Sequence, residues 1–168
     1  MKAEYINPFV SAAAEVFSTM LQCELTRGKL TIGNGSQPTM DISGVIGLSG
    51  RATGTVVLSL DRAVALSATE ILLSQKCDSI DGDVIDAVGE LTNMVAGRAK
   101  AGLEHLAMSL ALPTVITGKN HVISFGSATQ TLAIPFTCDW GGIVLEVGLV
   151  ESPEAAEESM LAGSAAMA

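Results

Sequence analysis

Aromatic and basic residues are scarce in this sequence. Only 4% of its 168 residues are Phe, Trp or Tyr while 48% are hydrophobic, so its core is expected to be aliphatic, with methionine filling gaps. Nine Lys and Arg stand against 18 Asp and Glu, which gives a formal net charge of −9. This acidity argues against binding to nucleic acids or to anionic membrane surfaces, because both attract basic proteins. It favours a protein partner with a basic face.

Cysteine, histidine and long apolar runs are also scarce. The three cysteines, at positions 23, 77 and 138, are odd in number and far apart. They do not suggest a disulfide framework, so we expect a reduced, cytoplasmic protein. The only histidines, His105 and His121, form no closely spaced ligand pair, so no metal site is expected. Neither a transmembrane helix nor a signal peptide is predicted, since polar and charged residues interrupt every candidate run.

Hydrophobic periodicity and turn residues predict the order helix, strands, two helices, strands. The predicted helices cover residues 8–22, starting at Pro8, then 61–75 and 81–109; the predicted strands cover residues 41–50, 52–60, 114–118, 121–125, 129–137 and 142–150. This order predicts an α+β fold in which an antiparallel sheet has helices packed on one face. We expect a single domain over residues 1–151, followed by a mobile, acidic and Ala-rich tail over 152–168.

The long predicted helix carries two stripes. At about 100° per residue, with Val84 set at zero, the residues at 88, 91, 95, 99, 102 and 106 fall within roughly 60° of Val84 and form the apolar stripe. Asp86, Glu90, Asn93 and Gly97 fall at about 180° to 240°, on the opposite side. A polar stripe of this kind is ordinarily the solvated face of an amphipathic helix.

Three features favour a docking surface instead of a solvated face. Asn93 is a mediocre helix former in mid-helix. Gly89 and Gly97 each cost about 0.5–1 kcal/mol relative to Ala, and they would let another surface approach the backbone. Glu90 has Met94 four residues later instead of a cation, so its carboxylate lacks a local partner. Both interpretations stay open on these residues alone.

A family resemblance adds to this pattern. The spacing D-x-x-x-E-x-x-N, filled by Asp86, Glu90 and Asn93, resembles the signature of the CheC/CheX/FliY family of chemotaxis phosphatases. The segments "MVAGRAK", "LPTVITG" and "AIPF" are more similar to CheX than to CheC, and the resemblance covers roughly residues 5–151. Arg98 departs from the pattern, which has a smaller polar residue there.

The resemblance implies a CheC/CheX-like fold with one active centre per chain. CheC-type proteins commonly have a second Glu/Asn helix, but here the helix over 61–75 has Leu73 three residues after Glu70. The implied activity is hydrolysis of the aspartyl phosphate of a CheY-like response regulator. Asn93 would position the attacking water, and Glu90 would pair with the active-site lysine of the regulator.

The resemblance also implies the partners. Asp86 and Gly97 would bind the regulator, and the acidic cluster at 78, 81, 83 and 86 would attract its basic surface. The regulator would bring Mg²⁺, so the chain would need no cofactor of its own. A homodimer formed through the sheets is expected. A non-catalytic receiver-binding or scaffold module of the same fold is the alternative, and it would use the same surface.

Overall fold

The computed structural model describes residues 3–33, 40–125 and 129–153. Its helices are α1 (Ala3–Leu21), α2 (Arg62–Leu73), α3 (Gly82–Ala101) and the 3-10 turn η1 (Glu104–Leu106). Its strands are β1 (Thr26–Arg27), β2 (Thr31–Gly33), β3 (Ile42–Ser49), β4 (Ala52–Leu60), β5 (Ser109–Leu110), β6 (Thr114–Thr117), β7 (Thr131–Cys138) and β8 (Gly141–Glu151). The predicted order of helices and strands is largely confirmed.

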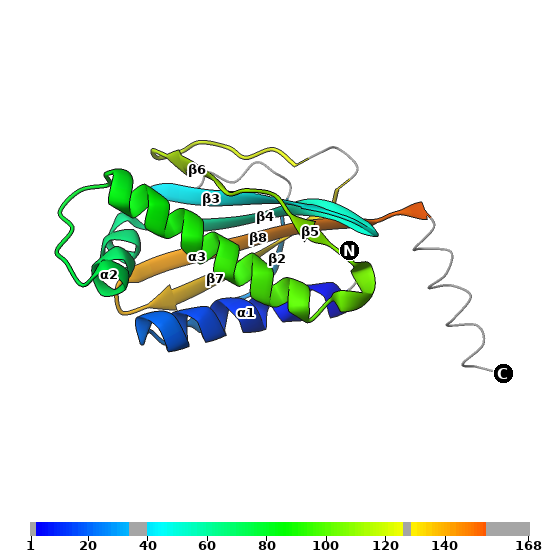
Figure 1. Cartoon of the computed structure of the whole chain (residues 1–168), viewed down its shortest axis with the longest axis horizontal. Helices are drawn as coiled ribbons and strands as arrows, with labels where there is room; N and C mark the ends of the chain where they lie inside the picture. Colours follow the sequence, from blue (N-terminus) through cyan, green and yellow to red (C-terminus); the bar gives the residue numbers. More distant parts are fainter. Residues whose placement is uncertain (1–2, 34–39, 126–128, 154–168) are drawn as a thin grey trace.

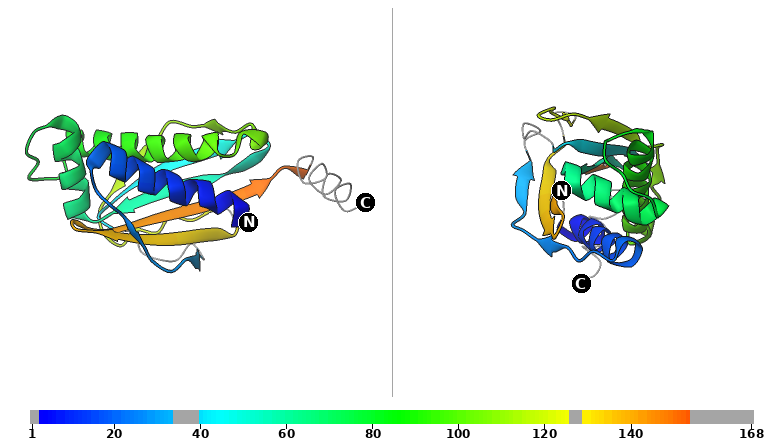
Figure 2. Two further views of the ribbon diagram at one scale, coloured as in Figure 1. Left: turned by 90° about the horizontal axis from the view of Figure 1, so that it is seen from below. Right: turned by 90° about the vertical axis from the view of Figure 1, so that its left-hand side faces the viewer.

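The strands form one antiparallel sheet. Its order is β1-β7-β8-β4-β3-β5, with β2 also paired to β7 and β6 also paired to β3. Figures 1 and 2 show α1 and α3 lying along one face of this sheet, with α2 across its end. Alternate residues of β8, among them Ile143, Leu145 and Val147, are fully buried in the core that includes the helices. The predicted α+β fold with helices on one face is therefore confirmed.

Helix α3 lies directly on β3 at the point where Thr92 meets Gly44. Thr92 is fully buried, and its Oγ1 donates a hydrogen bond of 2.7 Å to the carbonyl of Val88. A Cβ atom built on Gly44 would lie only 1.9 Å from Thr92 Oγ1. Because any side chain on this strand position would collide with the helix, Gly44 sets how closely α3 approaches the sheet.

The predicted ends of α1 and α3 were wrong. Helix α1 begins at Ala3, so Pro8 lies inside it and not at its start.

Helix α3 ends at Ala101 and does not continue to Ser109. Its last turn tightens, because the amides of Gly102 and Leu103 donate to the carbonyls of Ala99 and Lys100 at 3.0 and 2.9 Å. The chain beyond it then pairs with β3 as β5, and this tertiary pairing overrides the helical periodicity of the segment.

The prediction of a strand at 121–125 was also wrong. This segment has no strand conformation, although it contains the strand-favouring residues Val122, Ile123 and Phe125. Phe125 instead approaches the sheet face away from the helices, where its Cδ1 lies 3.2 Å from a Cβ built on Gly148. Phe125 therefore packs onto a strand without pairing with one.

Helix α2 differs from the prediction in its end and its inward face. It ends at Leu73, and the next residue, Ser74, has the left-handed conformation. The helical spacing of its apolar residues predicts that Ile71 faces the core, but Ile71 is 40% exposed. Asp61 occupies the N-cap position, yet its Oδ2 accepts a hydrogen bond of 2.7 Å from the amide of Gly142. Asp61 therefore fastens α2 to β8 and does not cap its own helix.

The predicted tail over 152–168 falls almost wholly outside the described residues, so its boundary stays a prediction. Among the helices that the structure describes, none combines the length and apolarity that a membrane span requires.

Candidate functional site

Local sequence fixes the start of α3 and places stabilising charges at both of its ends. Asp81 is its N-cap, and the Asp81 carboxylate accepts a hydrogen bond of 3.2 Å from the amide of Val84. Asp83 lies in the first turn, while Arg98 and Lys100 lie in the last. These charges oppose the helix dipole at both ends and so stabilise the helix.

The four residues of the predicted polar stripe lie on the outward side of α3. Asp86 and Glu90 are exposed, whereas Asn93 and Gly97 are half-buried. Within the described part of the chain, the side chains of Asp86, Glu90 and Asn93 make no hydrogen bond or ion pair. Glu90 and Asn93 are about 4.5 Å apart along the helix axis, so both could reach one small group on a partner. We call the residues Asp86, Glu90, Asn93 and Gly97 the outward stripe.

The outward stripe is bordered on one side by the segment that carries β5 and β6 (Figure 1). A Cβ built on Gly89 would lie 3.4 Å from Val115 Cγ2 and 3.7 Å from Pro113 Cγ. Gly89 is buried by this contact. The expectation that Gly89 exposes backbone to another protein is therefore wrong, because the glycine instead lets β6 pack against the helix.

Gly97 lies at the edge of a shallow hollow at the end of the outward stripe. The nearest side chain is that of Leu110, whose Cδ1 is 3.8 Å from a Cβ built on Gly97. The hollow measures about 610 Å³ and lies between the last turns of α3, the η1 turn and β5. Because Gly97 has no side chain, this end of the outward stripe stays accessible from the hollow.

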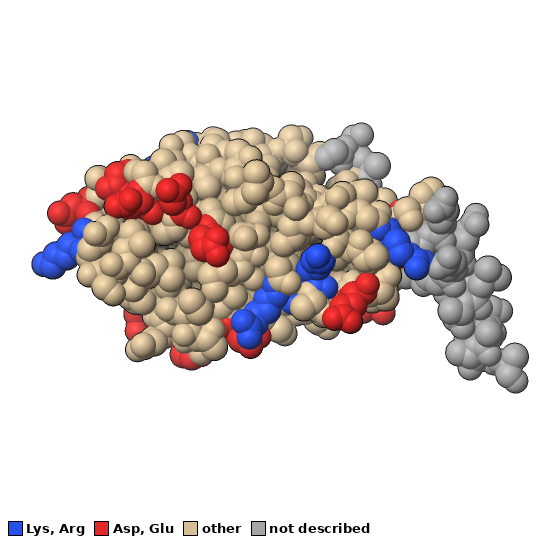
Figure 3. All heavy atoms as spheres, in the orientation of Figure 1, with Lys and Arg blue, Asp and Glu red and all other residues tan. Residues whose placement is uncertain are grey.

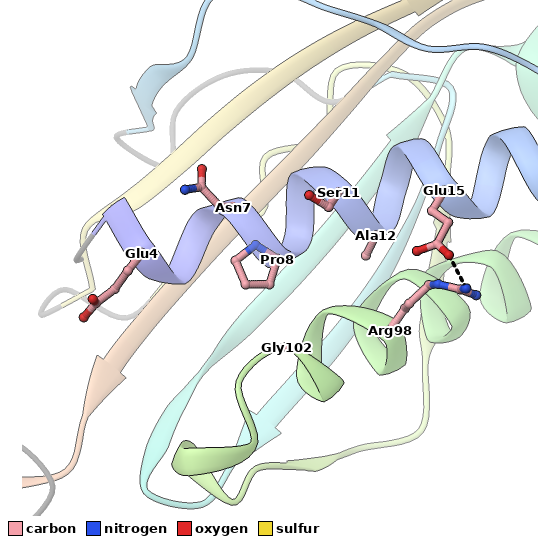
Figure 4. Close-up of a pocket in the computed structure, with 8 residues that line it drawn as sticks. All are labelled: Glu4, Asn7, Pro8, Ser11, Ala12, Glu15, Arg98 and Gly102. Atoms are coloured by element: carbon pink, nitrogen blue, oxygen red, sulfur yellow. Dashed lines mark hydrogen bonds and ion pairs between the residues drawn. The ribbon is translucent and has the colours of Figure 1, made fainter.

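On its other side, α3 is joined to α1 by an ion pair. The guanidinium of Arg98 donates to the carboxylate of Glu15, and Figure 4 shows the two side chains pointing toward each other above a groove of about 450 Å³. The Glu15 carboxylate raises the pKa of Arg98. Both side chains are 48% exposed, so the pair contributes little stability. Arg98, which departs from the family pattern, thus has a partner within the chain.

Acidic side chains gather at the start of α3. Asp78, Asp81, Asp83 and Asp86 are all exposed, and Figure 3 shows a continuous acidic area over this half of the helix. Burial raises the pKa of the Cys77 thiol, and the nearby carboxylates, first that of Asp81, raise it further. The carboxylates therefore create a local negative potential that would attract a basic surface.

Helix α2 does not repeat this arrangement. The Glu70 carboxylate accepts a hydrogen bond of 3.1 Å from the amide of Cys77 and thereby holds the α2–α3 loop. Three residues later the helix has Leu73, which is exposed. The Glu70 side chain thus has a role within the chain, whereas the Glu90 side chain has no partner in the part of the chain that the structure describes.

The histidines lie apart from the outward stripe. The ring of His105 is 6.1 Å from that of Tyr5, measured between centroids, and His121 Nδ1 is 2.8 Å from the carbonyl oxygen of Gly118. Across residues 3–33, 40–125 and 129–153, no three His, Cys, Asp or Glu side chains gather as a metal-binding group.

Comparison with known proteins identifies the family. The family model described as chemotaxis phosphatase CheX matches residues 42–137, which include β3, β4, α2, α3 and the outward stripe. The chain belongs to the CheX family. A curated relative, the CheY-P phosphatase CheX of Thermotoga maritima, is 28% identical over 130 residues, which are 75% of this chain and 84% of that protein.

Solved structures of CheX-like proteins have the same fold. A CheC-like superfamily protein from Shewanella sp. PV-4 is 35% identical, with a TM-score of 0.83 over 89% of this chain and 99% of that one. The CheX–CheY–BeF3–Mg²⁺ complex from Borrelia burgdorferi contains a chain that is 26% identical, with a TM-score of 0.76 over 89% of this chain and 100% of that one. The resemblance inferred from the motifs is therefore confirmed.

Proposed function

We propose that this chain is a phosphatase that hydrolyses the aspartyl phosphate of a CheY-like receiver domain. Its family and its relative, a CheY-P phosphatase, support this activity. The observation that carries the proposal is the pair of side chains of Glu90 and Asn93. They project from one side of α3, and neither side chain makes a hydrogen bond within the described chain. Two polar groups in this state are available to complete a site on another protein.

Asn93 is the residue that positions water. Its carboxamide oxygen accepts a hydrogen bond from the water and so aims it at phosphorus, in line with the bond to be broken. Attack forms a bond from the water oxygen to phosphorus while the bond from phosphorus to the aspartyl oxygen breaks. Inorganic phosphate leaves with the protons of the water, and the aspartate regains its carboxylate. A neutral amide suits this place because, unlike a carboxylate, it does not repel the phosphoryl oxygens.

Glu90 is the residue that fixes the docked partner. Its exposed carboxylate pairs with the active-site lysine of the receiver, one helical turn from Asn93. Asp86, which is also exposed, adds to the attraction at the rim, and Gly97 leaves room for the receiver beside the hollow. The acidic start of α3 guides the approach of a basic receiver surface.

The cofactor and the assembly are part of the proposal. Mg²⁺ arrives with the receiver, in keeping with the Borrelia burgdorferi complex, which contains both CheY and Mg²⁺. The ion neutralises charge that develops on the phosphoryl group. A homodimer and a cytoplasmic location stay predictions.

The test is a decay assay with a panel of receivers from the same cell. Each receiver is phosphorylated with radioactive phosphate, and its half-life is measured with and without substoichiometric amounts of this chain. We expect the half-life of at least one CheY-like receiver to shorten, with release of inorganic phosphate. If a receiver binds the chain and keeps its phosphate for as long as before, the chain is a non-catalytic binding module. If no receiver binds, the proposal is wrong.

A further inference from the structure

The most exposed large hydrophobic residue of the described chain lies beside the outward stripe. Leu112 is 90% exposed, more than any of the other six large hydrophobics that are exposed. Single exposed hydrophobic residues are common on protein surfaces and need no explanation by themselves. The position and backbone of Leu112 are what distinguish it.

The β5–β6 segment runs along α3 in the opposite direction, which locates Leu112. Leu110 lies 3.8 Å from a Cβ built on Gly97, and Pro113 lies 3.7 Å from a Cβ built on Gly89. Leu112 therefore lies between these two contacts. They are about 12 Å apart along the helix, and Asn93 lies midway between them. Leu112 and the carboxamide of Asn93 thus border the same part of the surface.

A bulge in the strand pairing accounts for the exposure of Leu112. Leu110 pairs with Leu48, but Thr114 pairs with Val45. Four steps along the β5–β6 segment therefore match only three along β3, so the segment contains one extra residue. An extra residue of this kind bends a strand and redirects its side chains, and such bulges are frequent beside active sites.

The backbone on both sides of Leu112 is held in place. The amide of Ala111 donates a hydrogen bond of 2.9 Å to the carbonyl of Gly47. On the other side, Pro113 has a fixed φ and packs against α3 at Gly89. Leu112 is therefore presented on a braced segment, and a partner that buries it loses little backbone entropy in doing so.

We infer that Leu112 anchors the receiver domain by inserting into an apolar part of its surface next to the phosphorylated aspartate. This inference rests on the proposed function and names a docking residue for the same site. The interface would be mixed in character, with carboxylates at the start of α3, Asn93 in the middle and an apolar contact on the β5–β6 side. The charges guide a basic receiver to the surface. Burial of Leu112 then holds it there.

Two variants of Leu112 test the inference. Leu112→Ala removes most of the apolar contact, while Leu112→Gln keeps its length and makes it polar. The probe is the receiver that the panel identifies, loaded with Mg²⁺ and beryllofluoride as a stable mimic of the phosphoryl group. We expect its Kd to rise about fivefold to thirtyfold, as burial of a leucine side chain predicts. The KM for the phosphorylated receiver should rise by a similar factor while kcat stays nearly constant, because Leu112 holds the partner without touching the reacting atoms.

A matched control separates anchoring from general effects. Ile32→Ala alters an exposed hydrophobic, 63% exposed, on β2, which pairs with β7 at the other side of the sheet. This variant should bind the receiver as the wild type does. All three variants should melt within about 2 °C of the wild type, because these side chains contribute little to the folded core.

Three outcomes would overturn the inference. If the Leu112 variants bind the receiver as tightly as the wild type, and the wild type still shortens the phosphate lifetime, Leu112 is not an anchor and the proposed function stands. If Leu112→Gln converts a dimer into a monomer in sedimentation, Leu112 belongs to an interface between two copies. If the wild type neither binds nor dephosphorylates any receiver, the proposed function itself has failed.

Discussion

Helices α2 and α3 each carry a glutamate on a partly or fully accessible side, but only one of the two has a side-chain partner among the described residues. Glu70 of α2 accepts a hydrogen bond from the amide of Cys77 and holds the loop between the helices. Glu90 of α3 makes no such contact within the described residues, and Asn93 follows it where α2 has only Leu73. The difference indicates that an acidic residue on a helix surface has to be judged by its contacts, since residue type alone would assign the two glutamates the same role.

The largest expected effect comes from removing the carboxamide that distinguishes α3. Asn93→Ala should lower the rate of receiver dephosphorylation at least about tenfold, because the water would lose the group that aims it at phosphorus. The free energy of unfolding should change by less than about 0.5 kcal/mol, since the Asn93 side chain makes no hydrogen bond to any described residue that the variant would break. Decay assays and urea unfolding measure the two quantities. Unchanged decay would remove Asn93 from the mechanism.

The next effect concerns the contact that seats α3 on the sheet. Gly44→Ala would place a Cβ 1.9 Å from Thr92 Oγ1 and 2.8 Å from Thr92 Cβ, so the helix has to move outward. We expect a loss of about 1–3 kcal/mol in the free energy of unfolding, together with lower activity, because Asn93 is the next residue on the displaced helix.

Gly47→Ala is the control for this variant on the same strand. Its Cβ would lie 3.6 Å from that of Ala111, which is an ordinary contact, so stability should be unchanged or slightly higher. Equal stability losses in the two variants would show that strand β3 tolerates no side chain at either position. The claim that Gly44 sets the height of α3 would then be wrong.

These two variants also illustrate how far sequence alone leads. The stripe of Asp86, Glu90 and Asn93 was predictable because helical geometry fixes the directions of residues three and four apart. The contact between Gly44 and Thr92 joins residues 48 positions apart in the sequence, and no local pattern reveals it. The same reason explains the misjudged role of Gly89, which depends on where β6 lies.

The end of α3 was mispredicted for a related reason. The residues after Gly102 continue the helical periodicity, so the pattern predicted a helix as far as Ser109. In the folded chain Ser109 pairs with Ser49 of β3, and this pairing decides the conformation of the segment. Family resemblance supplied the fold and the activity, but it could not supply the bulge that carries Leu112.

A third prediction sharpens the comparison between the two glutamates. Glu90→Gln should weaken binding of the beryllofluoride-loaded receiver about threefold to tenfold and make binding less dependent on salt, because it removes one charge from the interface. Glu70→Ala should leave binding and dephosphorylation unchanged. It should lower the free energy of unfolding by about 0.5–1.5 kcal/mol, because the amide of Cys77 loses its acceptor. The comparison fails if Glu70→Ala weakens receiver binding while Glu90→Gln lowers only the free energy of unfolding.

A smaller, pH-dependent effect is expected at Glu146, a carboxyl that is buried and not exposed. Glu146 is only 7% exposed on β8, and burial raises its pKa above the ordinary value of 4.5. The stability that the protonated form contributes is fully present below pH 4.5 and is lost as pH rises through the higher pKa of the folded chain. Glu146→Gln cannot lose a proton. Its stability relative to the wild type should therefore increase as pH rises from about 4 to about 7.

Urea unfolding of both proteins across this range tests the expectation. Activity should be unaffected, because Glu146 lies in the sheet and not on the outward stripe. A constant difference in stability at every pH would mean that the carboxyl titrates normally in the folded chain.

The central claim is that the outward side of α3 completes the catalytic pocket of a receiver domain. The most direct measurement is a crystal structure of this chain with its receiver, Mg²⁺ and beryllofluoride. We predict that Glu90 contacts the receiver lysine and that the Asn93 carboxamide holds a water in line with beryllium. A receiver bound to any other surface, with Glu90 and Asn93 both facing solvent, would contradict the account.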